Sequence, residues 1–300
     1  MRVLIAGGSG WIGSALVAKL VKEGHSVWIL SRRPEAVNLQ AGVSVAGWDG
    51  HTPQGWGHLV EEVDAIVNLV GENLGAGRWT AERKQRIVSS RLDAGKAIAA
   101  AVEQADRRPG VLIQSSAIGY YGVLDDQIVT ESSPAGTDFL AQLCVDWEAS
   151  TQAVENFGVR RAVVRTGLVL SPTGGSLARL LLPYRLFAGG PLGSGKQWWS
   201  WISMEDEVRA LMFLLENDRA YGAFNLTAPN PLQMKEFGKI LAQVIHRPYW
   251  LPVPAFVLRL LLGEMSILVL KGQRVVPQRL LELGFQFQHE HLKQALEVMF

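Results

Sequence analysis

The sequence has few of the features that mark secreted, metal-binding or nucleic-acid-binding proteins. A single cysteine, Cys144, among 300 residues excludes an internal disulfide framework and is typical of a reducing cytosol. The 29 lysines and arginines balance 28 aspartates and glutamates, and a net charge of +1 gives no electrostatic reason to bind nucleic acid or an anionic membrane. The six histidines lack metal-ligand spacing on a helix face, so no metal site is expected.

Long hydrophobic runs are also scarce. The best candidate for a membrane span, residues 253–270, contains Pro254, Arg259 and Glu264, whereas a spanning helix needs about 20 mostly apolar residues. This segment is more typical of a buried helix or a subunit interface, and it offers apolar surface for a homodimer. The first apolar stretch is short and ends in glycines, so no signal peptide is expected and a cytoplasmic location is predicted.

The amino terminus carries the most informative pattern. An apolar stretch over residues 3–6 runs into three glycines with GxxGxxG spacing, and a helical stretch over 14–22 follows. Glycines allow a tight turn, close approach of a ligand to the backbone and close helix packing, and a helix amino terminus favours a pyrophosphate. The sequence therefore predicts a dinucleotide site. The loop residues expected to contact the dinucleotide are Gly7, Gly10, Trp11, Ile12 and Gly13.

The residues at the end of the next predicted strand, over 26–30, indicate which dinucleotide the site binds. An NAD site usually has an acidic residue there to bind the ribose 2′-hydroxyl. This chain has Ser31, Arg32 and Arg33 instead, a hydroxyl and two guanidiniums that suit a 2′-phosphate. The pattern predicts NADP(H), although arginines are also ordinary surface residues.

Apolar strands alternate with helices through the first part of the chain. The predicted strands cover residues 3–6, 26–30, 43–46, 65–70, 111–115 and 161–164. The predicted helices cover 14–22, 80–102, 139–157, 204–217, 233–245 and 254–262. This alternation predicts an α/β fold with a Rossmann-type, doubly wound parallel sheet. A dinucleotide-binding domain is expected over 1–170, with later strands free to join its sheet, and a smaller, mostly helical substrate lobe over 171–300.

In an open parallel sheet, ligands bind beyond the carboxyl ends of the strands. That rule selects a set of expected cofactor neighbours, to which two arginines of the predicted 80–102 helix are added. These residues are Asp49, Leu69, Val70, Gly71, Arg86, Arg91, Ser115, Arg165, Thr166 and Val169.

The glycine loop, the segment 68–71 and the segment 115–117 together resemble the extended branch of the short-chain dehydrogenase/reductase superfamily. The resemblance implies a serine that polarises substrate oxygen and a Tyr-x-x-x-Lys pair for acid–base work. That pair is absent here. Leu140 falls at the expected tyrosine position, Cys144 at the lysine position, and Arg91 where the superfamily usually has asparagine.

These departures resemble an atypical, epimerase-like family whose pattern spans nearly the whole chain. The matching segments are 68–73, 78–80, 90–91, 119–122, 147–148, 189–195 and 272–277. The resemblance implies a sugar-nucleotide epimerase-like protein without establishing an activity.

Three residues are the candidates for catalysis. Ser116 is the remaining member of the usual triad, with a strand-end capping role as its alternative. Tyr120 could supply a proton near the nicotinamide, a role that the neighbouring Tyr121 phenol could also take, although aromatic packing explains both. Cys144 is placed only by the family position, and a buried, inert thiol is its alternative.

Two functions follow. The first is an NADP(H)-dependent oxidoreductase or epimerase-like enzyme with a small-molecule substrate, anionic or sugar-like. The second is a non-catalytic NADP(H)-binding sensor or scaffold, motivated by the missing tyrosine and lysine.

Overall fold

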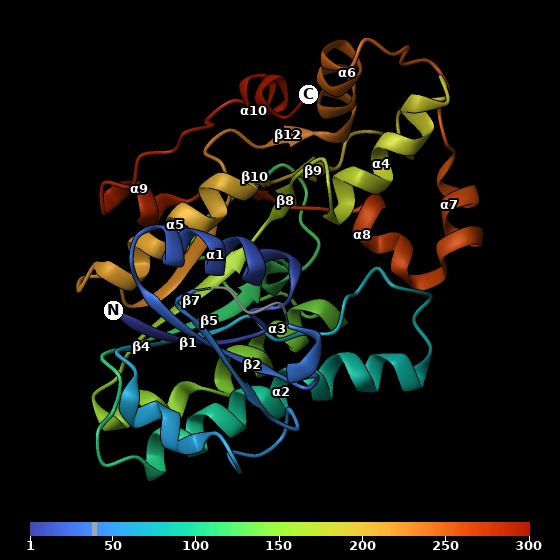
Figure 1. The fold of residues 1–300 in the computed structure, drawn as a ribbon. Helices are drawn as coiled ribbons and strands as arrows, with labels where there is room; N and C mark the ends of the chain where they lie inside the picture. Colours follow the sequence, from blue (N-terminus) through green and yellow to red (C-terminus); the bar gives the residue numbers. More distant parts are fainter. Residues whose placement is uncertain (38–40) are drawn as a thin grey trace.

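The computed structural model describes residues 1–37 and 41–300 and has a parallel β-sheet at its centre (Figure 1). The order across the sheet is β11-β7-β5-β4-β1-β2-β3, and all neighbours are parallel. The strands are β1 (Arg2–Ala6), β2 (Ser26–Ser31), β3 (Val43–Gly47), β4 (Ala65–Asn68), β5 (Val111–Ala117), β7 (Arg160–Thr166) and β11 (Gly222–Leu226). The chain winds outward from β1 in both directions, which confirms the predicted Rossmann-type, doubly wound sheet.

Helices cover both faces of this sheet. The four main ones are α1 (Trp11–Lys22), α2 (Ala81–Gln104), α3 (Phe139–Ala149) and α5 (Met204–Glu216). Because successive side chains of a strand alternate between faces, Val3 and Ile5 pack under α1 and α5 while Leu4 packs under α2. The apolar strands are therefore buried on both sides, as expected for a parallel sheet.

The predicted helix over 139–157 is wrong in its second half. The α-helix ends at Ala149, and a separate 3-10 turn, η4 (Gln152–Phe157), follows. The Ser150 hydroxyl donates to the Trp147 carbonyl at 2.7 Å. Hydroxyl side chains that bond to nearby backbone compete with helix propagation, which explains the break.

The carboxyl-terminal part is mostly helical, as predicted. Helices α4 (Gly175–Arg185), α6 (Met234–Val244) and α10 (Leu292–Met299) share a core that includes Tyr184, Trp201 and Phe237. The other helices are α7 (Ala255–Leu262), α8 (Ile267–Leu270) and α9 (Gln278–Glu282). Three two-stranded sheets pair β8 (Leu168–Leu170) with β10 (Trp201–Ser203), β9 (Trp198–Trp199) with β12 (Leu232–Gln233), and β6 (Ile128–Val129) with β13 (Arg274–Val275).

The remaining short elements are 3-10 turns: η1 (Pro34–Ala36), η2 (Gly57–Glu62), η3 (Ile118–Tyr121) and η5 (Gly263–Ser266). Among the residues that the structure describes, no helix is both long and apolar enough to cross a membrane.

Candidate functional site

The glycine-rich loop at the carboxyl end of β1 leaves no room for side chains at two of its positions. Gly7 has a φ of +86°, and a Cβ on it would lie 2.9 Å from the Leu69 carbonyl carbon. A Cβ on Gly13 would lie 2.2 Å from the Gly7 carbonyl oxygen. Gly10 is the N-cap of α1, and no side chain caps that helix. Backbone N–H groups of the first turn therefore face the space beyond β1, a donor set that fits a pyrophosphate.

Trp11, the first residue of α1, connects this loop to the carboxyl-terminal part. A Cβ on either Gly174 or Gly175 would come within 2.4 Å of the Trp11 indole. The start of α4 therefore lies directly against Trp11, and only glycines permit that approach. Ile12 is partly buried against the core beneath the loop.

The end of β2 presents the two arginines predicted to read a 2′-phosphate. The Ser31 hydroxyl accepts a hydrogen bond from the Arg33 backbone N–H at 3.1 Å, which fixes the turn. Arg32 and Arg33 are exposed, and neither guanidinium has an ion-pair partner among the described residues. Both are therefore available to an anion.

The carboxylate of Asp49, which follows β3, forms hydrogen bonds within its own loop. It accepts hydrogen bonds from the His51 backbone, the Thr52 backbone and the Thr52 hydroxyl at 2.7–2.8 Å. These bonds, the one from His51 first, lower the pKa of Asp49 to about 2. The carboxylate thus shapes the loop beside Arg32, whose Cδ lies 3.8 Å from where a Cβ on Gly50 would be.

Arg91, on α2, is buried beside the end of β4. Its guanidinium donates to the Glu72 carbonyl at 3.1 Å, lies 4.8 Å from the centre of the Trp147 ring, and would come within 2.9 Å of a Cβ on Gly71. Burial lowers the pKa of Arg91 to about 10, so the group remains charged at neutral pH. The structure therefore holds a desolvated cation next to the strand end where a dinucleotide ribose is expected.

The other residues predicted to contact the cofactor have, within the described chain, no specific partner that points to a ligand. Leu69 and Val70 are half-buried after β4, and Ser115 is half-buried in β5. Arg86 is half-exposed on α2 and lies 3.8 Å from a Glu72 carboxylate oxygen. Val169 is buried within β8.

Ser116 belongs to a polar network between β5, α3 and β7. Its hydroxyl donates to Glu148 Oε1 at 2.7 Å. Arg165 binds both oxygens of the same carboxylate, at 2.8 and 2.9 Å, and donates to the Tyr121 hydroxyl at 3.1 Å. The Tyr121 hydroxyl in turn donates to Asn225 at 2.6 Å. Burial lowers the pKa of Arg165, but the bonds and charge of Glu148 outweigh it and hold that pKa above its usual value.

The two tyrosines after β5 have different environments. Burial raises the pKa of Tyr121 to about 12, so its phenol is a poor base. Tyr120 is half-buried, and the Arg165 guanidinium lies 3.4 Å from the centre of its ring. Of the pair, Tyr120 has the phenol better suited to meet a ligand.

Cys144 lies on the inner face of α3 with only 4% of its surface exposed. Burial, and after it the Glu148 charge, raise the pKa of its thiol to about 11 and outweigh the opposing effects of Ser116, the Ala117 backbone and Arg91. A neutral thiol in the core is the state this environment favours, which argues against thiolate chemistry.

Thr166, at the carboxyl end of β7, donates to a buried carboxyl group. Its hydroxyl lies 2.8 Å from Glu207 Oε1, whereas Glu207 Oε2 is buried without a hydrogen-bond partner. Burial raises the pKa of Glu207 to about 8. The hydroxyl of Thr166 is therefore already engaged in a hydrogen bond on the face of the sheet that α1 and α5 cover.

Sequence reasoning did not select Glu148 or Glu207 as site residues. Helix α3 has two acids, Asp146 and Glu148, and the spacing of four and seven residues from buried Cys144 and Ala141 is the signal that marks Glu148 as inward-facing. Glu207 follows two other acids at the start of α5, where acidic residues normally serve the helix dipole. Only its spacing of four and seven residues from buried Leu211 and Leu214 marks it as inward-facing.

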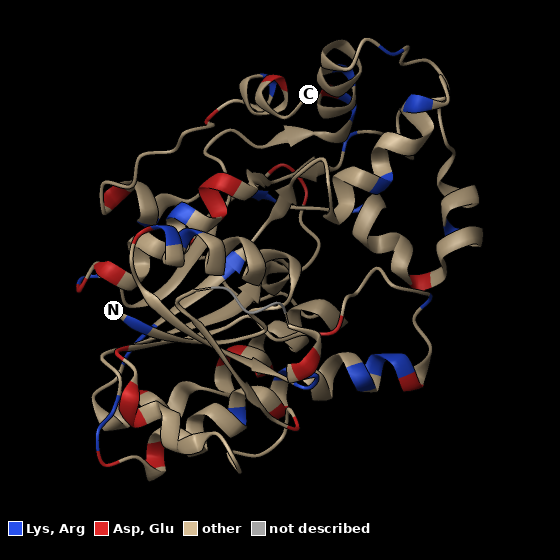
Figure 2. Ribbon diagram, viewed as in Figure 1, with Lys and Arg blue, Asp and Glu red and all other residues tan. Residues whose placement is uncertain are grey.

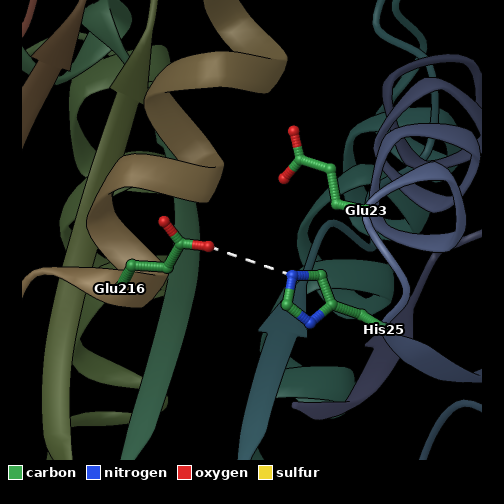
Figure 3. Close-up of side chains that lie close together, drawn as sticks. All are labelled: Glu23, His25 and Glu216. Carbon is green, nitrogen blue, oxygen red and sulfur yellow. Dashed lines mark ion pairs between the residues drawn. The ribbon is translucent and has the colours of Figure 1, made fainter.

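One group of potential metal ligands lies at the opposite edge of the sheet. Single ligand atoms of Glu23, His25 and Glu216 fall within 4.8 Å of one another (Figure 3). His25 Nε2 is 3.9 Å from Glu216, and Glu23 also pairs with Lys19 at 2.6 Å. Glu23 and His25 follow the carboxyl end of α1, and Glu216 is the last residue of α5. The group is therefore separate from the glycine loop.

The open parallel sheet, the glycine loop and the polar groups at the carboxyl ends of the strands together define a dinucleotide-binding protein of the doubly wound class. The chain belongs to the NAD dependent epimerase/dehydratase family, whose model matches residues 3–227. Residues 253–299 match a domain of unknown function, DUF1731.

Individual relatives confirm the predicted epimerase-like family. Epimerase family protein YfhF of Bacillus subtilis is 39% identical over 299 residues, covering 99% of this chain and 97% of that protein. The chloroplastic SDR39U1 homolog of Arabidopsis thaliana is 39% identical over 302 residues, covering 100% of this chain and 86% of that protein. A crystal structure of human epimerase family protein SDR39U1 with NADPH is similar with a TM-score of 0.89 at 32% identity, covering 100% of this chain and 99% of that one.

Proposed function

We propose that this chain binds NADP(H) and acts as an oxidoreductase or epimerase-like enzyme on a small polar substrate. The observation that carries the proposal is the glycine loop, where backbone occupies the space that side chains at Gly7 and Gly13 would fill. Such close packing leaves a helix amino terminus open to a pyrophosphate. The similarity to human SDR39U1, whose structure contains NADPH, supports the same cofactor here.

Arg32 and Arg33 would bind the 2′-phosphate that distinguishes NADP(H) from NAD(H). Both are exposed beside Ser31 without a carboxylate partner in the described chain. Arg91 would hold the ribose next to the end of β4, because its buried guanidinium lies against Gly71. The same guanidinium donates to the carbonyls of Ile87 and Glu72, which fix the cation at that position.

Ser116 and Tyr120 would face the reacting part of the substrate. When bound, the nicotinamide of NADP(H) supplies or accepts a hydride. The Ser116 hydroxyl donates to Glu148, so its lone pairs remain free to accept a hydrogen bond from a substrate hydroxyl. The Tyr120 phenol, under the Arg165 cation, would exchange the proton on that oxygen.

A non-catalytic sensor is the second candidate, and one observation favours it. The single proton of Ser116 is already donated to Glu148 at 2.7 Å, so the hydroxyl would have to rotate to polarise a carbonyl. A protein that only binds NADP(H) needs no such rotation.

A turnover screen with a Ser116→Ala variant separates the two. With NADPH or NADP+ present, sugar nucleotides and small carbonyl compounds are tested for change in nicotinamide absorbance, and sugar nucleotides also for epimerisation by NMR. The enzyme proposal predicts turnover that falls about 100-fold or more in Ser116→Ala while NADPH affinity is unchanged. Ser89→Ala, which removes a half-buried hydroxyl on α2, is the matched control. NADPH binding without turnover of any compound would favour the sensor.

A further inference from the structure

A cavity of about 260 Å³ lies where α4 and α6 end beside each other (Figure 1). Three nitrogen-bearing side chains, those of Arg185, His246 and Arg247, line it together with apolar residues that include Leu181 and Val244. Among the described residues no aspartate or glutamate lines this cavity, and Figure 2 shows no red segment at the ends of the two helices. The cavity therefore combines cationic groups with an apolar wall.

The two arginines of this cavity are not neutralised. Neither Arg185 nor Arg247 forms an ion pair with any residue that the structure describes. Arg247 donates to the His246 carbonyl at 3.0 Å, and its guanidinium lies 4.9 Å from the centre of the Phe187 ring. These contacts hold the side chain but use few of the five N–H groups of a guanidinium. Both arginines can therefore bind an anion.

The two turns beside the cavity have an unusual backbone. Phe187 follows the end of α4 with a φ of +60°, and His246 follows the end of α6 with a φ of +52°. In the described part of the chain they are the only residues other than glycine with a positive φ. The left-handed residue after a helix is usually glycine, because a Cβ is strained there. Side chains kept in such conformations are typical of ligand-binding sites.

The helix dipole explains only part of this arrangement. A cation at the carboxyl end of a helix is stabilised by the dipole, which accounts for Arg185 in the last turn of α4. It does not account for Phe187 and His246, because glycine at either position would relieve the strain and leave both arginines in place. Both side chains serve the cavity instead, since His246 lines it and the Phe187 ring lies against Arg247.

This cavity is separate from the glycine loop. Helix α4 begins at Gly175, which packs against Trp11, and it has 11 residues. Since an α-helix rises about 1.5 Å per residue, the last turn of α4 lies about 15 Å from that contact. A volume of about 260 Å³ is at the small end of the range for ligand pockets, so the cavity suits a small molecule.

We propose that this cavity binds a small phosphate monoester. Guanidiniums hold phosphate through paired, charge-assisted hydrogen bonds, and Arg185 and Arg247 supply two of them at one cavity. The His246 ring adds a further N–H donor. Leu181 and Val244 would contact the organic part of the ligand. This inference concerns a second ligand site and does not depend on the proposed cofactor or reaction.

Isothermal titration calorimetry of the full chain with phenyl phosphate and with inorganic phosphate tests the proposal. Phenyl phosphate is expected to bind with a Kd of about 0.1–1 mM, and inorganic phosphate about threefold or more weakly, because it has no apolar part. Arg185→Gln with Arg247→Gln should weaken phenyl phosphate binding about 10-fold or more. Arg219→Gln with Arg259→Gln removes two exposed guanidiniums elsewhere and should leave the affinity within about twofold.

His246→Gly separates a ligand-binding role of the strained turn from a structural one. Glycine adopts a φ of +52° without strain, so the melting temperature of this variant should stay the same or rise. Its affinity for phenyl phosphate should fall about threefold or more, because a donor of the cavity is lost. An affinity equal to that of the unmodified chain would contradict the proposal.

A further comparison distinguishes this site from the proposed cofactor site. Phenyl phosphate binding that is lost in Arg32→Ala with Arg33→Ala, but kept in the Arg185/Arg247 variant, would place the phosphate at the cofactor site and overturn the proposal. The absence of binding of either probe at about 10 mM would also overturn it. Binding that depends on Arg185 and Arg247 alone supports it, whether or not the chain binds NADP(H).

Discussion

The Ser116 hydroxyl donates to Glu148 Oε1 at 2.7 Å, while Arg165 grips both oxygens of the same carboxylate. The hydroxyl expected to meet substrate is therefore oriented by a buried ion pair between α3 and β7. The side chains of Glu148 and Arg165 are 14% and 6% exposed, so most of the solvent that would screen them is excluded. This arrangement makes Glu148 a positioning residue for Ser116 rather than a group that contacts substrate.

Glu148→Ala is expected to destabilise the protein by about 3–5 kcal/mol, because it leaves the Arg165 cation buried without its partner. Urea unfolding, with the free energy extrapolated to water, measures this loss. Glu236→Ala removes an exposed pair with Lys239 and should cost less than about 1 kcal/mol. A Glu148→Ala loss as small as that of the control would show that the network contributes little to the fold.

Gly13→Ala is expected to abolish tight dinucleotide binding, because its Cβ would lie 2.2 Å from the Gly7 carbonyl and force the loop open. Gly77→Ala is the control, since nothing lies within 4 Å of a Cβ there. Titration of both variants with NADPH, followed by nicotinamide fluorescence, gives the comparison. We expect the Gly13 variant to lose about 100-fold or more in affinity and the Gly77 variant less than about threefold. Equal affinities would mean that the loop does not hold the cofactor.

Glu207 gives the stability of the protein a specific pH dependence. Burial raises its folded-state pKa from 4.5 to about 8, so the folded protein retains a proton that the unfolded chain has released within this window. The unfolding free energy therefore falls as pH rises from 4.5 to about 8, by up to about 1.4 kcal/mol per pH unit from this group. Below pH 4.5 the contribution of Glu207 to the unfolding free energy is fully present.

Glu207→Gln should remove that component, because the amide does not titrate. Unfolding free energies measured at intervals across the window are compared with those of Glu205→Gln, which changes an exposed acid in the same helical turn. The Glu205 variant should keep the slope of the unmodified protein. Identical slopes in all three proteins would contradict the assignment of a raised pKa to Glu207.

The local patterns of the sequence were sufficient to predict the sheet and the geometry of the glycine loop. Glycines at fixed spacing between an apolar strand and a helix have few structural solutions, and the loop at Gly7 matches the expected one. Regular alternation likewise predicted the parallel sheet. Strand β11 was not predicted, because buried Asn225 interrupts its apolar pattern and bonds with Tyr121 from a distant part of the chain.

The polar networks could not be predicted because their members are far apart in sequence. Ser116 and Glu148 are 32 residues apart, and Thr166 and Glu207 are 41 apart. Sequence patterns indicate which face of a helix is buried, but they do not show which distant side chain meets it there. The same limit explains the 139–157 helix, whose break depends on where the Ser150 hydroxyl bonds.

Binding of NADPH in preference to NADH is the central claim, and paired fluorescence titrations test it most directly. The account predicts tight NADPH binding that weakens about 10- to 100-fold in Arg32→Ala with Arg33→Ala, while NADH affinity stays the same. Arg219→Ala with Lys293→Ala removes equal charge from exposed positions elsewhere and should leave both affinities unchanged. Equal affinity for the two dinucleotides in the unmodified protein, or no binding of either, would contradict the account.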